Sequence, residues 1–308
     1  MGFIALIVFI VVQIVFIPLA IIGFILVAIN QLFVSKRLGV SSTAISAMGQ
    51  RWIMNAYGMR KDPATAKLYR ALPNGSEIGV WLLLFPSFLR YKIHPSFAKE
   101  GKESITNAIQ ARTFDIDKLI NKSKDKVEQF VIMGAGYDTR CYGDLKRNNL
   151  QFFELDQEKT QKLKMECLKK AGIDASHVTF VEVDFSTEKW YEKLEKAGFD
   201  PGKKSLFLWE GVTLYLSEND VRKTIKEIKE HAASGSILIA DLCSKRLLAL
   251  QGVKATNEKF NFGLDFSVNP EKVLKTFIES EKVNLGDFYF IGHKTKKGVY
   301  MAVAEIIV

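Results

Sequence analysis

Apolar and polar positions divide the chain into one long apolar stretch and a later part in which short apolar runs alternate with helical patterns. Residues 3 to 29 are apolar except for Gln13, and the first 34 residues carry no charge. A helix of that length would extend roughly 40 Å, more than the about 30 Å of bilayer hydrocarbon. We therefore expect a membrane-spanning helix that tilts, or kinks at Pro18, and ends near Asn30.

The basic residues that follow this stretch predict its orientation. Lys36 and Arg37 come directly after it, and no basic residue precedes it, so the following body should be cytoplasmic and the N-terminus should face outward. Residues 1–34 are thus predicted to be a single-pass anchor. Two alternatives stay open. A cleaved signal peptide would carry a basic start and a shorter apolar core, and a buried core helix would normally have a polar face.

A second apolar run, Val80 to Leu89 (VWLLLFPSFL), is too short to span a membrane, and we expect Pro86 to break it. Basic and aromatic residues follow at 90–94. The run could lie in the membrane interface, form the lid of an apolar substrate pocket, or pack as a core helix. We assign residues 35–110 to a helical cap or lid region.

From residue 127 onward, β-rich runs alternate with helical patterns, which is typical of a parallel sheet covered by helices. The predicted strands are 128–133, 151–155, 178–183, 205–209, 236–241, 286–291 and 298–307. The predicted helices are 158–171, 187–197, 218–233 and 270–282. The last two strands have no helix between them and should form an antiparallel hairpin through His293 to Lys297. Such a seven-stranded, Rossmann-like α/β fold over 111–308 is typical of class I methyltransferases.

Charge and cysteine content narrow the function classes. The net charge of +9 comes from lysines that are scattered and form no basic tract, which gives little support to nucleic-acid binding. A basic body beside a membrane would be attracted to anionic lipid. Cys141, Cys167 and Cys243 lack the spacing of a disulfide framework or a zinc site.

A glycine turn follows the first predicted strand of the α/β region. Gly134, Ala135 and Gly136 form a G-x-G sequence that lets a ligand approach the backbone closely. Thr139 stands where the full dinucleotide motif has its third glycine. The pair therefore predicts either a cofactor loop or a turn that only reverses the chain.

Acidic residues end the next strands. Glu154 and Asp156 follow Gly136 by 18 to 20 residues, the spacing at which a carboxylate meets ribose hydroxyls, and strand alternation puts both on one face. Asp184 ends the third strand, where an adenine would lie, and Glu210 follows the fourth strand below the expected reaction centre. Each acid alone could be a solvated or structural carboxylate, but their repetition at successive strand ends favours a site.

These motifs together resemble the leucine carboxyl methyltransferase family, including its bacterial S-adenosylmethionine-dependent branch. The matching stretches are ARTFDID (111–117), VIMGAGYDTR (131–140), FFELDQEKTQKLK (152–164), VEVDF (181–185), AGFDP (197–201), LWEGVTLYL (208–216) and, more loosely, VSSTAISAMGQRW (40–52). Two features depart from the family pattern. They are the N-terminal anchor and the apolar run at 80–89, and both weaken the case for a soluble protein substrate.

The resemblance implies S-adenosylmethionine as cofactor and a set of cofactor-binding residues. They are Arg112, Gly134, Ala135, Gly136, Asp138, Glu154, Asp156, Asp184 and Glu210. Within this set Arg112 would pair with the methionine carboxylate, because a planar guanidinium group can donate two parallel hydrogen bonds to a carboxylate. Glu210 and Tyr215 would face the cofactor amine and the acceptor, and we take them as catalytic candidates.

The expected reaction is methyl transfer to an oxygen of a lipophilic small molecule. No metal is needed, because the protein has mainly to align a nucleophile and exclude water. None of the motifs contains a histidine, which favours a carboxylate acceptor because a hydroxyl would need a base. Two alternatives remain. They are methylation of a protein's C-terminal carboxylate and a noncatalytic membrane adaptor with this fold.

Overall fold

The computed structural model describes residues 3–93, 95, 98–146, 149–185, 187–250 and 260–308. The chain forms two compact units that do not follow chain order. Unit 1 comprises residues 1–97, 137–139 and 162–173, and unit 2 comprises residues 98–136, 140–161 and 174–308.

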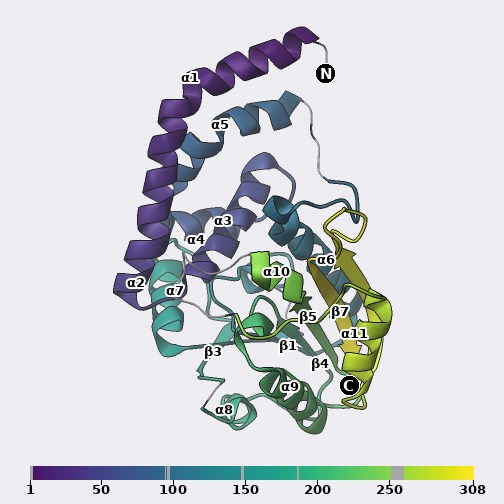
Figure 1. The fold of residues 1–308 in the computed structure, drawn as a ribbon. Coiled ribbons are helices and arrows are strands. Elements are labelled where there is room, and N and C mark those ends of the chain that lie inside the picture. The colour runs from purple at the N-terminus through teal and green to yellow at the C-terminus, as the bar shows by residue number, and fades with distance from the viewer. Residues whose placement is uncertain (1–2, 94, 96–97, 147–148, 186, 251–259) are drawn as a thin grey trace. The chain divides into compact units, whose positions relative to one another are not determined.

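Unit 2 is built on a seven-stranded sheet with the order β3-β2-β1-β4-β5-β7-β6 (Figure 1). Its strands are β1 (Gln129–Met133), β2 (Gln151–Asp156), β3 (Val178–Glu182), β4 (Ser205–Trp209), β5 (Ile237–Cys243), β6 (Asn284–Ile291) and β7 (Met301–Ile307). The first five strands are parallel, and β7 pairs antiparallel with both β5 and β6. The predicted fold and its terminal hairpin are confirmed.

The central strands are buried along their whole length, and most of their residues are apolar, because helices cover both faces of the sheet. Every residue of β1, β4 and β5 is buried, as expected for parallel strands covered on both sides. One face packs against α8 (Trp190–Lys196), α9 (Glu218–His231) and α11 (Pro270–Glu279). The other face packs against α6 (Ala108–Ser123) and α10 (Lys245–Leu250).

Local signals explain where the helices of unit 2 begin. Helix α9 starts at a capping box, in which the Ser217 side chain accepts from Asp220 N and the Asp220 carboxylate accepts from Ser217 N. Helix α11 starts with Pro270 behind the Asn269 cap, and the Asn269 side chain accepts from Lys272 N. Helix α7 (Glu158–Lys170), which connects β2 to β3, has residues in both units.

Unit 1 is helical. Its elements are α1 (Phe3–Ala28), a π-helical turn η1 (Ile29–Val34), α2 (Ser35–Leu38), α3 (Ser42–Tyr57), α4 (Pro63–Ala71) and α5 (Glu77–Ile93). The apolar helix does not end near Asn30 as we expected, because helical backbone continues through the π-helical turn to Leu38. Gly39 then ends it in the left-handed conformation with φ of 66°.

The apolar run at 80–89 lies inside one continuous helix, α5, so the prediction that Pro86 breaks it is wrong. A proline interrupts only one backbone hydrogen bond, and packing of a helix on neighbouring helices can compensate for that loss. Val80 and Pro86 are buried, and the apolar side chains between them are half-buried. The segment is therefore neither fully buried nor free of neighbours.

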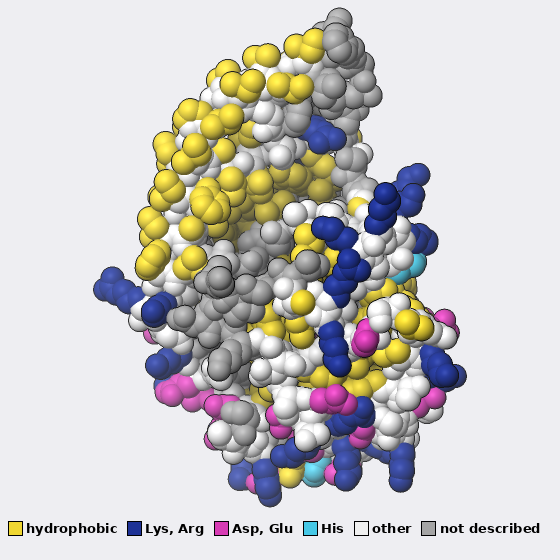
Figure 2. All heavy atoms as spheres, in the orientation of Figure 1, with side chains coloured by type: hydrophobic (Ala, Val, Ile, Leu, Met, Phe, Trp, Pro, Cys, Tyr) yellow, Lys and Arg dark blue, Asp and Glu magenta, His cyan; other side chains and the backbone are white. Residues whose placement is uncertain are grey.

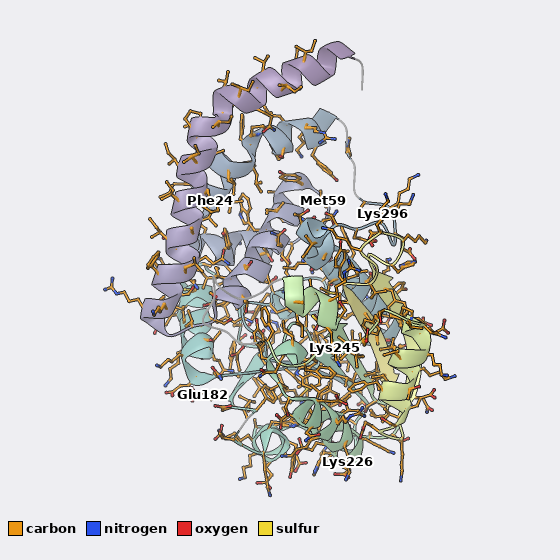
Figure 3. All side chains as sticks on the ribbon, in the orientation of Figure 1. Phe24, Met59, Glu182, Lys226, Lys245 and Lys296 are labelled. Atoms are coloured by element: carbon orange, nitrogen blue, oxygen red, sulfur yellow. The ribbon has the colours of Figure 1, made fainter. Side chains whose placement is uncertain are left out.

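The large side chains of α1 are mostly exposed, including Val15 (66%) and Phe24 (61%, labelled in Figure 3). Among the described residues one stretch, Ile10–Leu38, is long and apolar enough to cross a membrane, with a mean hydropathy of 3.0. A signal sequence or a buried core helix passes the same test, but only 6% of this stretch is buried. The exposure of α1 argues against the core-helix alternative.

Candidate functional site

The loop after β1 is tied to the end of β2. Gly134 N and Ala135 N both donate to the Leu155 carbonyl at 2.9 Å, and Gly136 N donates to the Asp156 carboxylate. Gly134 and Gly136 have φ of 69° and 47°, which favour glycine. A Cβ at Gly134 would lie 2.5 Å from Val212 Cγ2, so no larger residue fits there.

The acids predicted at the ends of β2 and β3 occupy different environments. Asp156 is half-buried at the last position of β2, while Glu154 is 1% exposed and its carboxylate accepts from the Tyr142 hydroxyl at 2.9 Å. Asp184 is half-buried just beyond β3, and its backbone N–H donates to Glu188. Asp156 and Asp184 are thus accessible to a ligand, whereas Glu154 is held inside the unit.

The sheet order identifies where a ligand of this fold binds. The chain runs from β1 outward through β2 and β3 and then returns to pair β4 with the other side of β1. Loops at the carboxyl ends of β1 and β4 therefore diverge, and ligands of open parallel sheets bind in that crevice. The glycine turn, Asp156 and Glu210 all follow strands at this edge.

A buried ionic network lies below these strand ends. Arg112 on α6 donates to Asp241 at 2.8 Å and pairs with Glu210 at 2.9 Å. Arg140 pairs with the other oxygen of Glu210 at 2.7 Å and with Asp117 at 2.8 Å. Both arginines, Glu210 and Asp241 have side chains that are at most 9% exposed. Glu210 is therefore clamped between two guanidinium groups.

Asp241 also fixes the loop after β4. Its carboxylate accepts from Gly211 N at 2.7 Å, and its backbone carbonyl accepts from the Thr213 hydroxyl at 2.7 Å. Burial raises the pKa of Asp241, against the opposing effect of Arg112. Burial opposes the charge of Arg112, but Glu210 and Asp241 raise its pKa overall, so that the guanidinium stays charged.

Tyr215 lies on the short helix η5 (Thr213–Tyr215) that follows this loop. Its ring packs on Phe260 with 5.4 Å between ring centroids, and its carbonyl accepts from the Asn261 side chain. The side chain is half-buried. The sequence-predicted pair Glu210 and Tyr215 thus belongs to one loop, which Asp241 holds in place.

Asp138 is part of unit 1, although it follows the glycine turn in the chain. It forms a buried ion pair with Arg51 on α3 at 2.9 Å, with side chains 6% and 5% exposed. The neighbouring Thr139 hydroxyl donates to Asp62, the cap of α4. Residues 137–139 are therefore fixed by the helices of unit 1.

Sequence reasoning missed three residues of the ionic network. Asp117 and Arg140 both lie in stretches that carried the family resemblance but received no role. Asp241 was not considered, although an acid near the end of an apolar strand was the signal that identified Asp156 and Asp184. The Arg51–Asp138 pair joins residues far apart in the chain and has no local sequence signal.

The residues present fit S-adenosylmethionine. Asp156 offers a strand-end carboxylate suited to two ribose hydroxyls. Arg112 Nε is buried and has no hydrogen-bond partner among the described residues, so this arginine keeps a donor beyond those it gives to Glu210 and Asp241. Within the described part of the chain no group of three or more His, Cys, Asp or Glu residues could hold a metal ion.

Comparisons with known proteins agree with the geometry. The model of the leucine carboxyl methyltransferase family matches residues 76–229, half of the chain. The Bacillus subtilis protein YktD, named as an S-adenosyl-L-methionine-dependent methyltransferase, is 32% identical over 156 residues, which are 50% of this chain and 51% of that protein. A protein from Mycobacterium bovis with the same type of name is 25% identical over 226 residues, or 69% of each chain.

The chain spans about half the length of the first two relatives that it matches, at 51% and 49%. Among solved structures, a DUF574 family protein from Streptomyces avermitilis has a TM-score of 0.51 at 11% identity, with 79% of this chain and 96% of that chain covered. This similarity supports the fold alone. Together with the family match over residues 76–229, these findings establish that the chain belongs to the leucine carboxyl methyltransferase family.

Proposed function

We propose that this protein is a membrane-attached, S-adenosylmethionine-dependent methyltransferase that methylates an oxygen, carboxylate or hydroxyl, of a lipophilic small molecule. The observation that carries the proposal is the combination of family membership with accessible acids at the ends of β2 and β3, of which Asp156 binds the glycine turn. We place the body on the cytoplasmic side, because its net charge of +9, with Lys36 and Arg37 at the end of the apolar helix, favours the anionic cytoplasmic leaflet.

In this proposal the cofactor is held by the chain's own polar groups. When bound, S-adenosylmethionine supplies a methyl group made electrophilic by its sulfonium. Asp156 would accept hydrogen bonds from the ribose hydroxyls, and Asp184 would accept from the adenine side. Arg112 would use its remaining donor toward the methionine carboxylate, while Glu210 and Asp241 hold its fork in position.

Glu210 has a positioning role in this account. Two guanidinium groups neutralise its carboxylate, so it is poorly placed to remove a proton from an acceptor. Instead, Glu210 holds the side chains of Arg112 and Arg140 in position below the strand ends. Tyr215, half-buried on the same loop, is the better candidate to contact the acceptor.

An open apolar cavity in unit 1 supports a lipophilic acceptor. It has a volume of about 380 Å³ and is lined by Phe16, Trp81, Leu82 and Phe85. Residues of α1 and α5 thus offer an apolar surface suited to a hydrocarbon chain.

Methylation of a protein's C-terminal carboxylate is the second candidate, because the name of the matched family favours it. A methylated lipophilic small molecule would partition into the organic phase, whereas a methylated protein would stay with the precipitated protein. A noncatalytic adaptor would share the fold and would yield no product.

The test is methyl transfer from radiolabelled S-adenosylmethionine into membrane extracts by the full-length protein. We expect label in the organic phase and identify the product there. Label that stays with precipitated protein would favour the second candidate, and no transfer to any fraction would favour the adaptor. The Leu82→Trp variant, which fills the cavity, should raise KM for the acceptor but not for the cofactor. Leu89→Trp, at an exposed position of the same helix, is the matched control.

A further inference from the structure

Helices α1 and α5 pack with their backbones in direct contact at two glycines. A Cβ added to Gly23 would lie 2.5 Å from the Gly79 carbonyl and 2.6 Å from Leu83 N. A Cβ added to Gly79 would lie 3.0 Å from the Gly23 carbonyl. Small residues allow such close approach in membrane helix pairs. The apolar helix is therefore not an isolated anchor but one member of a pair.

The two helices run antiparallel along most of α5. The rings of Phe16 and Phe85 lie 5.1 Å apart between centroids, and at the other end the Asn30 side chain donates to the Gly75 carbonyl at 2.8 Å. The glycine contact lies between these two points. Figure 1 shows α1 bending above α5, which follows the same course.

The opposite side of α5 packs on α3. Trp81 meets Trp52 at 5.3 Å and Phe88 meets Tyr57 at 5.4 Å between ring centroids, both edge to face. Helix α5 is therefore enclosed between α3 and α1, and α1 is the outermost layer of unit 1. Figure 2 shows the hydrophobic side chains gathered over α1.

We propose that α1 and α5 enter a single leaflet of the bilayer as one unit, so that α1 does not cross the membrane and the N-terminus stays on the side of the body. This inference rests on the membrane attachment proposed above. The occupant of the exposed apolar face of α1 is bilayer hydrocarbon. This one-leaflet arrangement would replace the single-pass topology expected from the sequence.

The positions of basic residues on α5 oppose a span. Phe16 is the midpoint of the apolar residues 3–29, so a spanning α1 would put Phe16 and its neighbour Phe85 near the bilayer midplane. Arg90 follows Phe85 by five residues, which is about 7.5 Å of helix, whereas half the hydrocarbon is about 15 Å thick. A spanning helix would thus draw Arg90 into the hydrocarbon, where charge is strongly disfavoured.

The chain after α5 adds a second objection. Helix α5 ends at Ile93, and Lys99, Glu100 and Lys102 follow within ten residues. In a single-pass protein this charged segment would have to return from the far half of the bilayer to the body. Non-helical backbone facing lipid leaves its polar groups unsatisfied there. A pair of helices in one leaflet requires no such return.

The test uses full-length protein with a protease-cleavable tag at each end, in sealed vesicles that expose the body. We expect both tags to be removed to the same extent without detergent. An N-terminal tag that stays protected until detergent is added, while the C-terminal tag is cleaved, would overturn the inference. Protein absent from the membrane fraction would overturn the attachment itself, and so the two failures are distinguishable.

A depth measurement gives a second readout. Val8, Val15 and Ile22 are exposed on α1 and lie seven residues apart, about 10.5 Å along the axis. Spin labels at these positions should all lie within one leaflet. A label at Val15 near the midplane, with those at Val8 and Ile22 equally shallow on either side of it, would show a spanning helix and contradict the proposal.

Discussion

The two most apolar parts of the molecule, the central strands of unit 2 and helix α1 of unit 1, have opposite surroundings. All residues of β1, β4 and β5 are buried between two layers of helices. Helix α1 is covered by α5 on one side and exposes large apolar side chains elsewhere. Apolar sequence alone thus predicts removal from water. The elements that cover a segment decide whether protein or lipid replaces that water.

The largest expected effect separates these two regions directly. Phe207 is 1% exposed in β4 and packs against Trp190 and Phe199, so Phe207→Ala should lower the free energy of unfolding by about 3–5 kcal/mol. Phe24→Ala, on the exposed face of α1, should leave it nearly unchanged in detergent micelles. Denaturant unfolding measures both. Equal losses would mean that α1 is packed against protein on all sides.

A second prediction tests whether ionic groups in unit 2 are as tightly constrained as its apolar core. Arg112→Met leaves the buried carboxylates of Glu210 and Asp241 without one partner and should lower the free energy of unfolding by about 3 kcal/mol. Lys226→Met, which removes the exposed pair with Glu230 (Lys226 is labelled in Figure 3), should cost about 0–1 kcal/mol. Similar losses in thermal or denaturant unfolding would contradict a specific role of the buried network.

A third prediction examines the helix contact in unit 1. Gly23→Leu would force the backbones of α1 and α5 apart and should cost about 1–3 kcal/mol. Ile22→Leu changes an exposed neighbour and serves as the control. Thermal unfolding in detergent compares the two variants. If both behaved like the wild type, the close approach of the glycines would be unnecessary for the pair.

The sheet was predictable from the sequence because its strands are short apolar runs separated by helical patterns and capped helices. For the candidate site, the sequence pattern located the strand-end positions of Asp156 and Asp184, and their role in cofactor binding stays a prediction. Pro86 was misjudged because tertiary packing, which a local rule omits, keeps α5 continuous. Glu154 looked equivalent to Asp156 by alternation, yet the Tyr142 hydroxyl binds it inside the unit. Arg51 and Asp241 depend on distant contacts that one sequence does not reveal.

The central claim is that the glycine turn and the strand-end acids bind S-adenosylmethionine. Calorimetric titration of the full-length protein with S-adenosylhomocysteine tests it most directly. We expect binding by the wild type and at least about a tenfold loss of affinity, or about 1.4 kcal/mol, in Gly136→Val and in Asp184→Ala. Glu182→Gln, at an exposed position of β3, should bind like the wild type. Unchanged affinity in both site variants, or no binding by the wild type, would contradict the account.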